Sequence, residues 1–447
     1  MRGHPRHPHR EVDAVSAGTL KYRGPLSGLS PEARRRLLER SGTSDAQVAE
    51  RTRELIARVR QDGDAALLEM ALQFDRARLS SLEVPRARWE EALAALKPEV
   101  RSALERAARN IATAHRAQKP QAIEVETEPG IVVGRRPDPL GRVGVYAPGG
   151  RAVYPSSVLM GVVPAKVAGV GEVIVCSPPG PDGLPAAGVL AAALLAGADR
   201  VFALGGAGAV AAMAYGTQSV PRVDRIVGPG NAYVAAAKLQ VVDAVAIDAP
   251  AGPSEILVVA DGSADPEAVA REMLAQAEHD PDACCVTLAV GQAQADAVAQ
   301  AVERASARAR RREIVSTSLR ERGAVLSVDS LEEAWPFVSA FAPEHLLLAT
   351  AAPQEHLARV RHCGTVFLGE RASVAFGDYM TGANHVLPTA GLGHAYSGLS
   401  VLDFYRWTAW QRVDREAAAR LAEDVGTLAD SEGLFAHAEA ARAWRHS

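Results

Sequence analysis

The stretch EILVVADGSADPEAVAREMLAQAEHDPDACCVTLAV, residues 255–290, decides the fold expected for this chain. It begins with a short apolar run, EILVVAD, and ends with another, CCVTLAV, and both are typical of buried strands. Between them, the segment DPEAVAREMLAQAEHD has apolar residues at helical spacing. A strand, a helix and a strand in this order predict a parallel α/β unit whose helices cover the sheet.

The same alternation continues on both sides of this stretch. Downstream, it predicts helices at 294–309, 330–345 and 353–362, which alternate with strands at 323–328, 346–350 and 364–369. Upstream, it predicts helices at 156–170, 184–197 and 231–242, which alternate with strands at 172–178, 200–206 and 244–250. Residues 123–150 alternate around a Pro-Gly turn and predict further strands, whereas residues 30–119 have a helical pattern. The predicted fold is therefore α/β, with two Rossmann-like parallel-sheet modules and small helical segments at the N- and C-terminal ends.

The composition is that of an ordinary globular protein and argues against several classes of function. With 447 residues the chain is too long for one typical core, and its net charge of −4 gives no sign of nucleic-acid binding. The longest apolar stretch, residues 184–198, is too short to cross a membrane. Four irregularly spaced cysteines predict free thiols in a reducing compartment, which favours the cytoplasm. The basic start, MRGHPRHPHR, lacks the apolar region of a secretory signal and is expected to be a disordered tail.

One candidate metal site lies in LAQAEHDPDACC, residues 274–285. Gln276 and His279 are three positions apart on the predicted helix, so both side chains project from one face. Together they offer an oxygen and a nitrogen ligand, although Gln is a rare ligand for zinc. Gln276 and His279 could instead form the polar face of a surface helix.

Two further stretches carry polar side chains that suit catalysis or metal binding. In FAPEHLLLA, Glu344 and His345 are adjacent at a helix–strand boundary, where an acid and a base could share proton transfers or simply form a solvated turn. The stretch GERASVAFGDYMTGANHVLPT, residues 369–389, is long for a loop, which favours a functional role. Within it, Asp378 could be a metal carboxylate or a turn former beside Gly377.

Two glycine-rich loops are candidates for cofactor binding. VFALGGAGAVAAMAYG follows a predicted strand and holds the dinucleotide-binding pattern, with Asp224 downstream of Gly206, Gly208 and Ala211. RIVGPGNAYVAAAK opens a predicted helix at Asn231, where free N–H groups could bind a phosphate or a carboxylate.

Taken together, seven motifs resemble those of histidinol dehydrogenases. They follow one another along most of the chain and are GRVGVYAPGG, VDRIVGPGNAYVAAAK, DAPAGPSEILVVAD, AQAEHD, FAPEHL, GDYMTGANHVLPT and SGLSVLDF. The resemblance implies oxidation of L-histidinol to L-histidine through L-histidinal, with two NAD⁺ in succession and with zinc. It divides the chain into an N-terminal tail and helix (1–40), a metal and substrate domain (41–145 plus 254–398), an NAD-binding domain (146–253) and a C-terminal helical tail (399–447).

The resemblance also assigns roles to individual residues. It implies that the zinc ligands, which also contact the substrate, are Gln276, His279, Asp378 and His437. The catalytic acid–base pair is Glu344 and His345, and His345 also touches the substrate. The remaining positions that line the substrate pocket are Ser254, His385 and Glu432. The cofactor contacts are Tyr146, Gly208 and Asn231. Gly208 stands where the family usually has glutamine, so Gly208→Gln is expected to tighten NAD⁺ binding.

A homodimer is the expected assembly. The helical segment around His437 is too small to hold a core of its own, and exchange of such a segment is a simple route to a closed dimer. Enzymes like this one complete the neighbour's zinc site with the tail. The resemblance therefore implies that His437 binds zinc in trans and that Glu432 reaches the same pocket.

Two other functions are compatible with part of the sequence. A paralogous enzyme using zinc and NAD could oxidise another small polar alcohol, such as a sulfonated diol, although a carboxylate at Glu432 suits an ammonium or imidazole group better. The metal residues could also serve a zinc hydrolase, but two glycine-rich α/β modules argue against that function. Formation of NADH separates the two classes.

Overall fold

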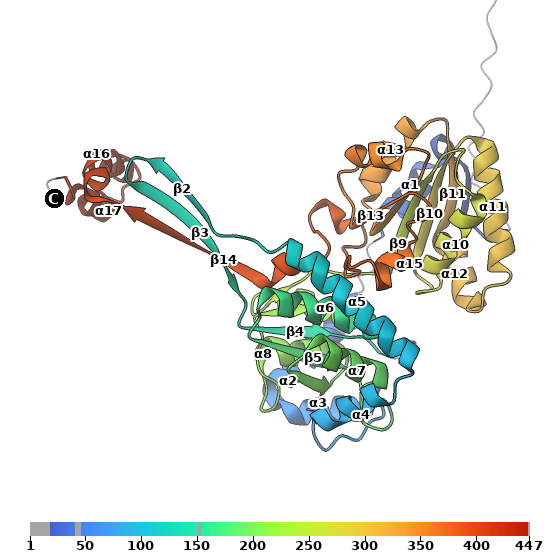
Figure 1. The fold of residues 1–447 in the computed structure, drawn as a ribbon, viewed down its shortest axis with the longest axis horizontal. Coiled ribbons are helices and arrows are strands. Elements are labelled where there is room, and N and C mark those ends of the chain that lie inside the picture. Colours follow the sequence, from blue (N-terminus) through green and yellow to red (C-terminus); the bar gives the residue numbers. More distant parts are fainter. Residues whose placement is uncertain (1–17, 41–45, 150–152, 446–447) are drawn as a thin grey trace, which may run out of the picture.

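The computed structural model describes residues 18–40, 46–149 and 153–445. The basic start expected to be a disordered tail lies outside these ranges. Figure 1 shows two α/β bodies and a narrow arm that projects from them. The predicted α/β class with two parallel sheets is thus confirmed.

A six-stranded parallel sheet forms the first body, which we call the six-stranded module. Its strands lie in the order β1 (Tyr22–Pro25), β11 (Gly323–Val328), β10 (Cys284–Val290), β9 (Glu255–Ala260), β12 (His345–Ala349) and β13 (Thr365–Leu368). One face is covered by α10 (Pro266–Ala277), α11 (Gln292–Ser306) and α12 (Arg312–Arg322), and the other by α1 (Pro31–Leu38) and α13 (Leu331–Phe341). Because both faces are covered, β9 and β11 are buried along their whole length, which explains their continuous apolar sequences.

A five-stranded parallel sheet forms the second body, the five-stranded module. Its strands lie in the order β6 (Arg200–Ala203), β5 (Glu172–Ser177), β4 (Arg142–Tyr146), β7 (Arg225–Val227) and β8 (Ala246–Ile247). One face packs on α4 (Arg86–Ala94), α5 (Pro98–Ala117), α6 (Pro155–Ala168) and α7 (Ala187–Ala196). The other packs on α2 (Ala46–Asp62), α3 (Asp64–Phe74), α8 (Gly206–Tyr215) and α9 (Ala232–Gln240).

Both sheets are doubly wound in the same way. In the five-stranded sheet, β4 is central, β5 and β6 follow on one side, and the chain then crosses to β7 and β8 on the other side. In the six-stranded sheet, β9 is likewise followed by β10 and β11 on one side and then by β12 and β13 on the other. The strand order therefore reverses between β4 and β7 in one module and between β9 and β12 in the other. Such reversal points leave a crevice at the carboxyl ends of the strands, where α/β proteins usually bind ligands.

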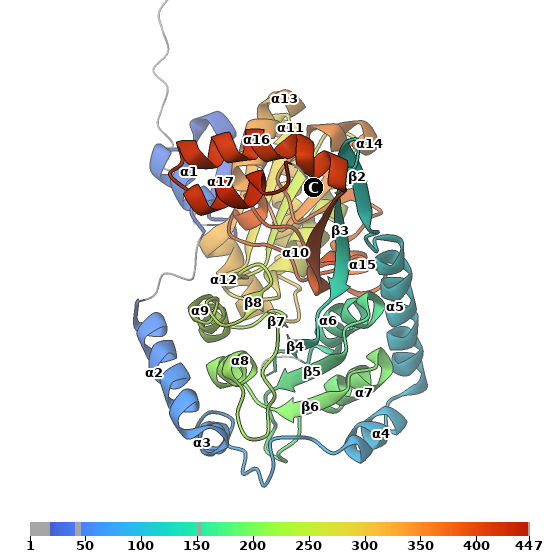
Figure 2. The same ribbon diagram turned by 90° about the vertical axis from the view of Figure 1, so that its left-hand side faces the viewer.

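The arm is a three-stranded antiparallel sheet that ends in two helices. Its strands, in the order β14 (Tyr405–Val413), β3 (Ile131–Pro139) and β2 (Ile123–Glu128), lead to α16 (Arg415–Ser431) and α17 (Phe435–Arg442). Figures 1 and 2 show these helices at the far end of the arm, away from both modules in the first view. Apolar side chains on the arm remain exposed, among them Ile123, Val125, Leu428 and Phe435.

The boundaries expected from the sequence differ from this arrangement. Residues 46–117, placed with the metal domain, instead pack on the five-stranded sheet, where Val59, Leu67 and Ile111 belong to its cores. Conversely, β1 and α1 are part of the six-stranded module and not a separate tail. Helical periodicity shows that one face of a helix is buried, but it does not show which sheet buries it.

The segment after residue 399 is also not wholly helical, as was expected. Its first long element is β14, which is rich in aromatic and β-branched residues and pairs with β3 along its whole length. Within the described ranges, no helix has both the length and the apolar character required to cross a bilayer.

Candidate active site

The predicted acid–base pair lies at the amino-terminal edge of the six-stranded sheet. His345 opens β12, Glu344 precedes it, and the neighbouring strand β9 begins at Glu255. The chain reaches this edge from α13 through Ala342, whose φ of +45° is left-handed and turns the chain into the strand. Parallel α/β proteins more often bind ligands at the carboxyl edge, so this site occupies the less usual edge.

The His345 ring is buried and has a defined tautomer. Its Nδ1 lies 2.9 Å from the carbonyl oxygen of Glu255, and a carbonyl only accepts, so Nδ1 carries the proton when the ring is neutral. The other nitrogen, Nε2, is 3.5 Å from Asp378 Oδ1 and has no hydrogen-bond partner in the part of the chain that the structure describes. Nε2 is therefore the atom that can accept a proton from a substrate.

The Glu344 carboxylate is held behind the imidazole. Its Oε2 accepts a hydrogen bond of 2.6 Å from the backbone N–H of Glu255 and lies 3.5 Å from His345 Nδ1. Burial raises the pKa of Glu344, against the opposing effect of His345. Burial alone would lower the pKa of His345, but the carboxylates of Glu344 and Asp378 raise it well above its usual range. The flanking carboxylates thus stabilise the positive charge that the His345 ring carries once Nε2 has taken a proton.

The loop that carries Asp378 and His385 joins the two modules. Asp378 lies near the end of α15 (Val374–Tyr379), and its carbonyl oxygen is 2.9 Å from His385 Nδ1. His385 Nε2 is 3.3 Å from the hydroxyl of Ser157, which belongs to α6 of the five-stranded module. The neighbouring Asn384 donates to the carbonyl oxygen of Met160, also on α6, at 2.8 Å. The site therefore lies where the two modules meet.

Gln276 and His279 approach the same region from the end of α10. Gln276 is 2 % exposed, and its side-chain nitrogen has no hydrogen-bond partner among the residues that the structure describes. His279 follows the helix. The pKa of Asp378 is low despite the opposing effect of burial, mainly because of the nearby His345, with smaller effects of His385 and His279. A buried amide without a partner, an imidazole and a carboxylate form a mixed oxygen and nitrogen donor set that fits Zn²⁺.

The remaining predicted ligands lie elsewhere in this chain. His437 is on α17 and Glu432 follows α16, and both are exposed at the end of the arm (Figure 1). Over residues 18–40, 46–149 and 153–445, no group of three His, Cys, Asp or Glu is placed to hold a metal. Within one subunit, His279 is near enough to Asp378 to affect its pKa, and Gln276 lies one turn earlier at the end of α10, whereas His437 is on the arm.

Ser254 lies directly before β9, next to the acid–base pair. Its side chain is half-buried, and its carbonyl oxygen accepts from the N–H of Cys284 at 3.0 Å. This position is next in sequence to Glu255, which contacts both Glu344 and His345. Ser254 is thereby placed at the same sheet edge as the predicted pocket residues.

Two of the three predicted cofactor residues lie around the reversal point of the five-stranded sheet. Tyr146 ends β4, and Asn231 caps α9 shortly after β7. The Asn231 side chain accepts from the N–H groups of Tyr233 and Val234 at 3.1 and 3.2 Å. The Tyr146 hydroxyl accepts from the N–H of Gly206 at 3.1 Å, and burial raises its pKa to about 12.

Gly208 does not face this crevice. It is buried within α8, and a Cβ atom there would lie 3.1 Å from Met70 Sδ and 3.2 Å from Leu67 Cδ2. A side chain at this position would therefore point into the contact between α8 and α3. The structure argues against the sequence-based expectation that Gly208 contacts the cofactor.

The candidate dinucleotide-binding pattern around Gly206 does not lie where that pattern is usually found. In the doubly wound fold that pattern occupies the turn after the first strand, whereas Gly206 follows β6 at the edge of the sheet. The downstream acid, Asp224, accepts from the N–H of Arg142 at 2.8 Å, at the start of β4. It thus lies at the amino edge of the sheet, away from the reversal point.

Sequence reasoning missed Glu255 and Ser157. Glu255 contacts both members of the acid–base pair, and Ser157 contacts His385 from the other module. The signal for Glu255 was a charged residue that opens an otherwise apolar strand. No local signal marked Ser157, because its role depends on how the modules meet.

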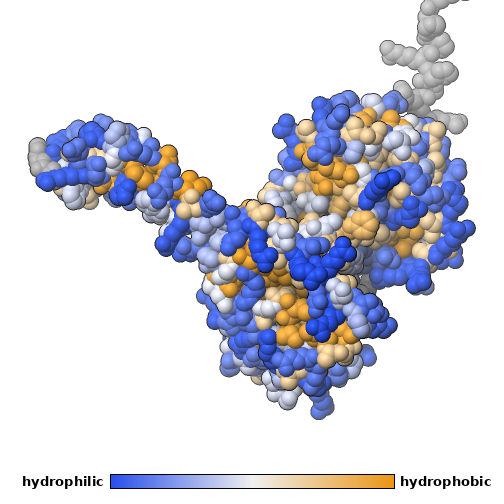
Figure 3. Space-filling view, in the orientation of Figure 1, coloured by the Kyte–Doolittle hydropathy of each residue, from blue (hydrophilic) through white to orange (hydrophobic). Residues whose placement is uncertain are grey.

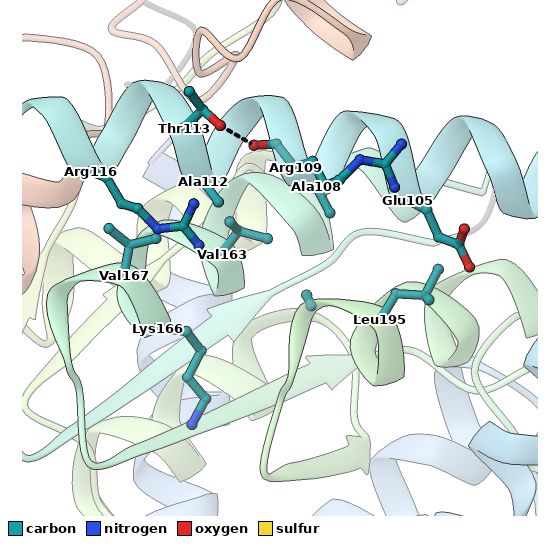
Figure 4. A pocket seen from close by; sticks show the side chains of 11 residues that line it. Glu105, Ala108, Arg109, Ala112, Thr113, Arg116, Val163, Lys166, Val167 and Leu195 are labelled. Carbon is teal, nitrogen blue, oxygen red and sulfur yellow. Dashed lines mark hydrogen bonds between the residues drawn. The ribbon is translucent and has the colours of Figure 1, made fainter.

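A groove on the outer side of the five-stranded module is separate from this site. Figure 4 shows it between α5, α6 and α7, with Arg109 and Arg116 on α5 and Lys166 pointing away from that helix. Its volume is about 690 Å³, and none of the predicted site residues lines it. Lys166 is paired with Asp199 at 2.5 Å. The space-filling view shows apolar surface beside polar residues on this module (Figure 3).

Comparison with known proteins agrees with the geometry. The family model described as histidinol dehydrogenase matches residues 38–445. Histidinol dehydrogenase of Natronomonas pharaonis is 50 % identical over 416 residues, which are 93 % of this chain and 97 % of that protein. That of Methanosarcina barkeri is 46 % identical over 419 residues, 93 % and 96 % of the two chains. The crystal structure of histidinol dehydrogenase from Elizabethkingia anophelis, 32 % identical, superposes with a TM-score of 0.91 and covers 96 % of this chain and 98 % of that one.

Proposed function

Because this chain belongs to the histidinol dehydrogenase family, we propose that it oxidises L-histidinol to L-histidine through L-histidinal in histidine biosynthesis. The observation that carries the proposal is the buried Glu344–His345 pair, in which His345 Nε2 lies 3.5 Å from Asp378 Oδ1. NAD⁺ would accept a hydride in each of the two oxidations. The remaining steps are proton transfers, which the residues of this chain perform.

His345 is the proton acceptor in this scheme. Its Nε2 takes the hydroxyl proton of the alcohol as the hydride leaves the carbon. In the second oxidation, the aldehyde must first add water, because a hydride departs only from a tetrahedral carbon. Once His345 has released the first proton to solvent, the same nitrogen takes a proton from that water, while Glu344 stabilises the imidazolium through Nδ1.

Zinc would be held by Gln276, His279 and Asp378, with His437 as the fourth ligand. The ion would supply a fixed positive charge that orients the amine and imidazole nitrogens of the substrate. Ser254, His385 and Glu432 complete the substrate pocket in this proposal. The contact of His385 with Ser157 keeps its ring at the boundary between the modules.

The five-stranded module is the proposed NAD-binding domain, and the six-stranded module the metal and substrate domain. Tyr146 and Asn231 flank the point where strand order reverses, the usual ligand crevice of this fold. That crevice and the amino edge of the other sheet both adjoin α6, which begins just after β4. The cofactor and the acid–base pair can then reach one substrate from opposite modules.

A homodimer in which the arm completes the neighbour's site is the proposed assembly. The arm leaves Ile123, Val125, Leu428 and Phe435 between 53 % and 67 % exposed, an apolar surface that a partner subunit would cover. The arm helices are too small to hold a core and sit away from the site of their own subunit. His437 and Glu432 of the partner subunit would then supply the missing ligand and carboxylate.

A cytoplasmic location is proposed from the cysteines. All four are free thiols, and Cys176, Cys284 and Cys285 are buried. Burial raises the pKa of Cys284 to about 12, so it is inert as a nucleophile. The thiols next to the proposed zinc ligands therefore have no assigned role.

The decisive experiment is an assay of the purified protein with L-histidinol and NAD⁺. We expect about two NADH for each histidine formed. With a sulfonated diol of similar size, we expect NADH to form at less than a tenth of the rate measured with histidinol. Hydrolysis of an ester or amide substrate without NADH formation would instead support a zinc hydrolase. Rapid oxidation of the diol with none of histidinol would overturn the proposed substrate.

A further inference from the structure

A buried ion pair lies directly behind the acid–base pair. It joins Arg40, which follows α1, to Glu255, which opens β9, and their side chains are only 2 % and 3 % exposed. These two residues lie far apart in sequence but meet under Glu344 and His345. Neither belongs to the metal, substrate or cofactor residues assigned above.

The Arg40 guanidinium uses all of its N–H donors in this position. Nε donates to Glu255 Oε1 at 2.6 Å, and Nη2 donates to Oε2 at 3.0 Å, so the carboxylate is held by two parallel bonds. The other donors bond the carbonyl oxygens at the ends of two helices, those of Leu37, Leu38 and Phe341. The guanidinium carbon also lies 3.5 Å from the centre of the Phe341 ring.

The main chain of Glu255, whose side chain Arg40 holds in place, forms hydrogen bonds with both catalytic residues. Its N–H donates to Glu344 Oε2 at 2.6 Å, and its carbonyl oxygen accepts from His345 Nδ1 at 2.9 Å. Its side chain also accepts from the N–H of Ala390 at 2.9 Å, which connects the loop that carries His385. One residue therefore contacts both catalytic groups while its side chain is fixed by Arg40.

We propose that Arg40 and Glu255 are positioning residues that fix the rotamer of Glu344 and the tautomer of His345. The inference rests on the acid–base role proposed above. A buried ion pair adds little net stability compared with apolar residues of the same volume, so its main consequence here is the geometry that it imposes. Small displacements of a catalytic group, of about 1 Å, are enough to slow a reaction by about 10²-fold.

The test is Arg40→Lys, which keeps the charge but loses the planar fork and two donors. We expect kcat to fall by about 10- to 100-fold, while KM for histidinol, KM for NAD⁺ and zinc content per chain stay within about twofold. The solvent isotope effect on kcat should rise, because proton transfer becomes slower relative to the other steps. A loss of folded protein would lower the rate without changing the isotope effect.

The matched control is Arg23→Gln. Arg23 is on β1 of the same module, and β11 and β10 separate this strand from β9, which begins at Glu255. Arg23 pairs with Asp296 at 2.8 Å, and its side chain is 35 % exposed. This variant should keep the wild-type kcat. Rates are expressed per zinc-loaded, NAD⁺-binding site, so that misfolded protein does not count.

Two results would overturn the inference. One is Arg40→Lys with kcat within twofold of wild type, and the other is a lower kcat with an unchanged isotope effect. If Arg40→Lys does not fold, the double variant Arg40→Met with Glu255→Gln removes both charges together and is judged by the same criteria. His345→Asn is assayed in parallel: if it keeps full turnover, the acid–base proposal itself fails, and if it is slow, only the positioning role is in question.

Discussion

Gly208→Gln is the substitution for which the structure reverses the expectation from the sequence. The family resemblance suggested that glutamine would add a hydrogen bond to NAD⁺. In the fold, a Cβ at this position meets Met70 Sδ at 3.1 Å and Leu67 Cδ2 at 3.2 Å. Ordinary contacts between such atoms are about 3.5–4.0 Å, so α3 and α8 would have to separate slightly.

The expected loss of stability follows from these contacts. Overpacking of a buried site costs about 1–3 kcal/mol, and burial of an amide without a partner costs about 1–3 kcal/mol more. Replacing glycine within a helix returns at most about 1 kcal/mol. The net change is a destabilisation of at least about 1 kcal/mol, which lowers Tm by at least roughly 2–4 °C for a module of this size.

The assay combines thermal unfolding with calorimetric titration of NAD⁺. Gly208→Gln should lower Tm and leave the Kd for NAD⁺ unchanged or weaker. Combined with Met70→Ala, which removes the closest atom, it should cost less than the sum of the two single variants. The packing argument is refuted if Gly208→Gln keeps the wild-type Tm and binds NAD⁺ about tenfold more tightly, the gain expected from one hydrogen bond.

Four further outcomes follow from the proposed function and the structure. His345→Asn should lower turnover by about 10²-fold or more with zinc content unchanged, as rate assays and elemental analysis will show. A chelator should abolish activity and added Zn²⁺ should restore it; active protein without any transition metal would contradict the zinc site. Burial raises the pKa of Asp75 to about 6, so its stabilising protonated form is lost as pH rises through that value; Asp75→Asn should raise Tm at about pH 8 and leave it unchanged at about pH 4. His279→Ala and His437→Ala, each nearly inactive alone, should regain activity when refolded together; verified heterodimers without activity would exclude ligation in trans.

The strands and helices of both modules could be predicted largely from the sequence because their signals are local. The run ILVVA after Glu255 is apolar throughout because β9 is covered on both faces, and α10 shows helical spacing because one side faces the core. The partner of α2 to α5 could not be predicted in this way. Their apolar faces are visible in the sequence, but the choice between two similar sheets depends on contacts across the chain.

Short or exposed elements escaped prediction for a related reason. β1 and β7 have only four and three residues, too few for a period to show, and they are strands because their neighbours offer hydrogen bonds. β14 is half-exposed and pairs with β3 from far along the chain. Sequence reasoning therefore predicted strands at β2 and β3 of the arm but missed β14, although it anticipated that the terminal segment needs a partner.

The site shows the same division between local and non-local information. Gln276 with His279, and Glu344 with His345, were found because each pair is close in sequence. Glu255 was missed, although it contacts both catalytic residues, because its contribution is made mainly by backbone groups that carry no sequence signature. Motif resemblance identifies side chains that react, and it is less informative about the residues that hold them.

The position of the acid–base pair at the amino edge of its sheet has a structural explanation. The cofactor crevice proposed here lies at the carboxyl edge of the other sheet, beside β4 and β7. A substrate that must lose a proton to one module and a hydride to the other needs these two edges to face each other. The contacts of His385 with Ser157 and of Asn384 with Met160 hold the substrate loop against α6, which begins at that carboxyl edge. The same loop therefore both lines the pocket and sets the distance between the modules, so catalysis depends on an alignment that neither module could provide alone.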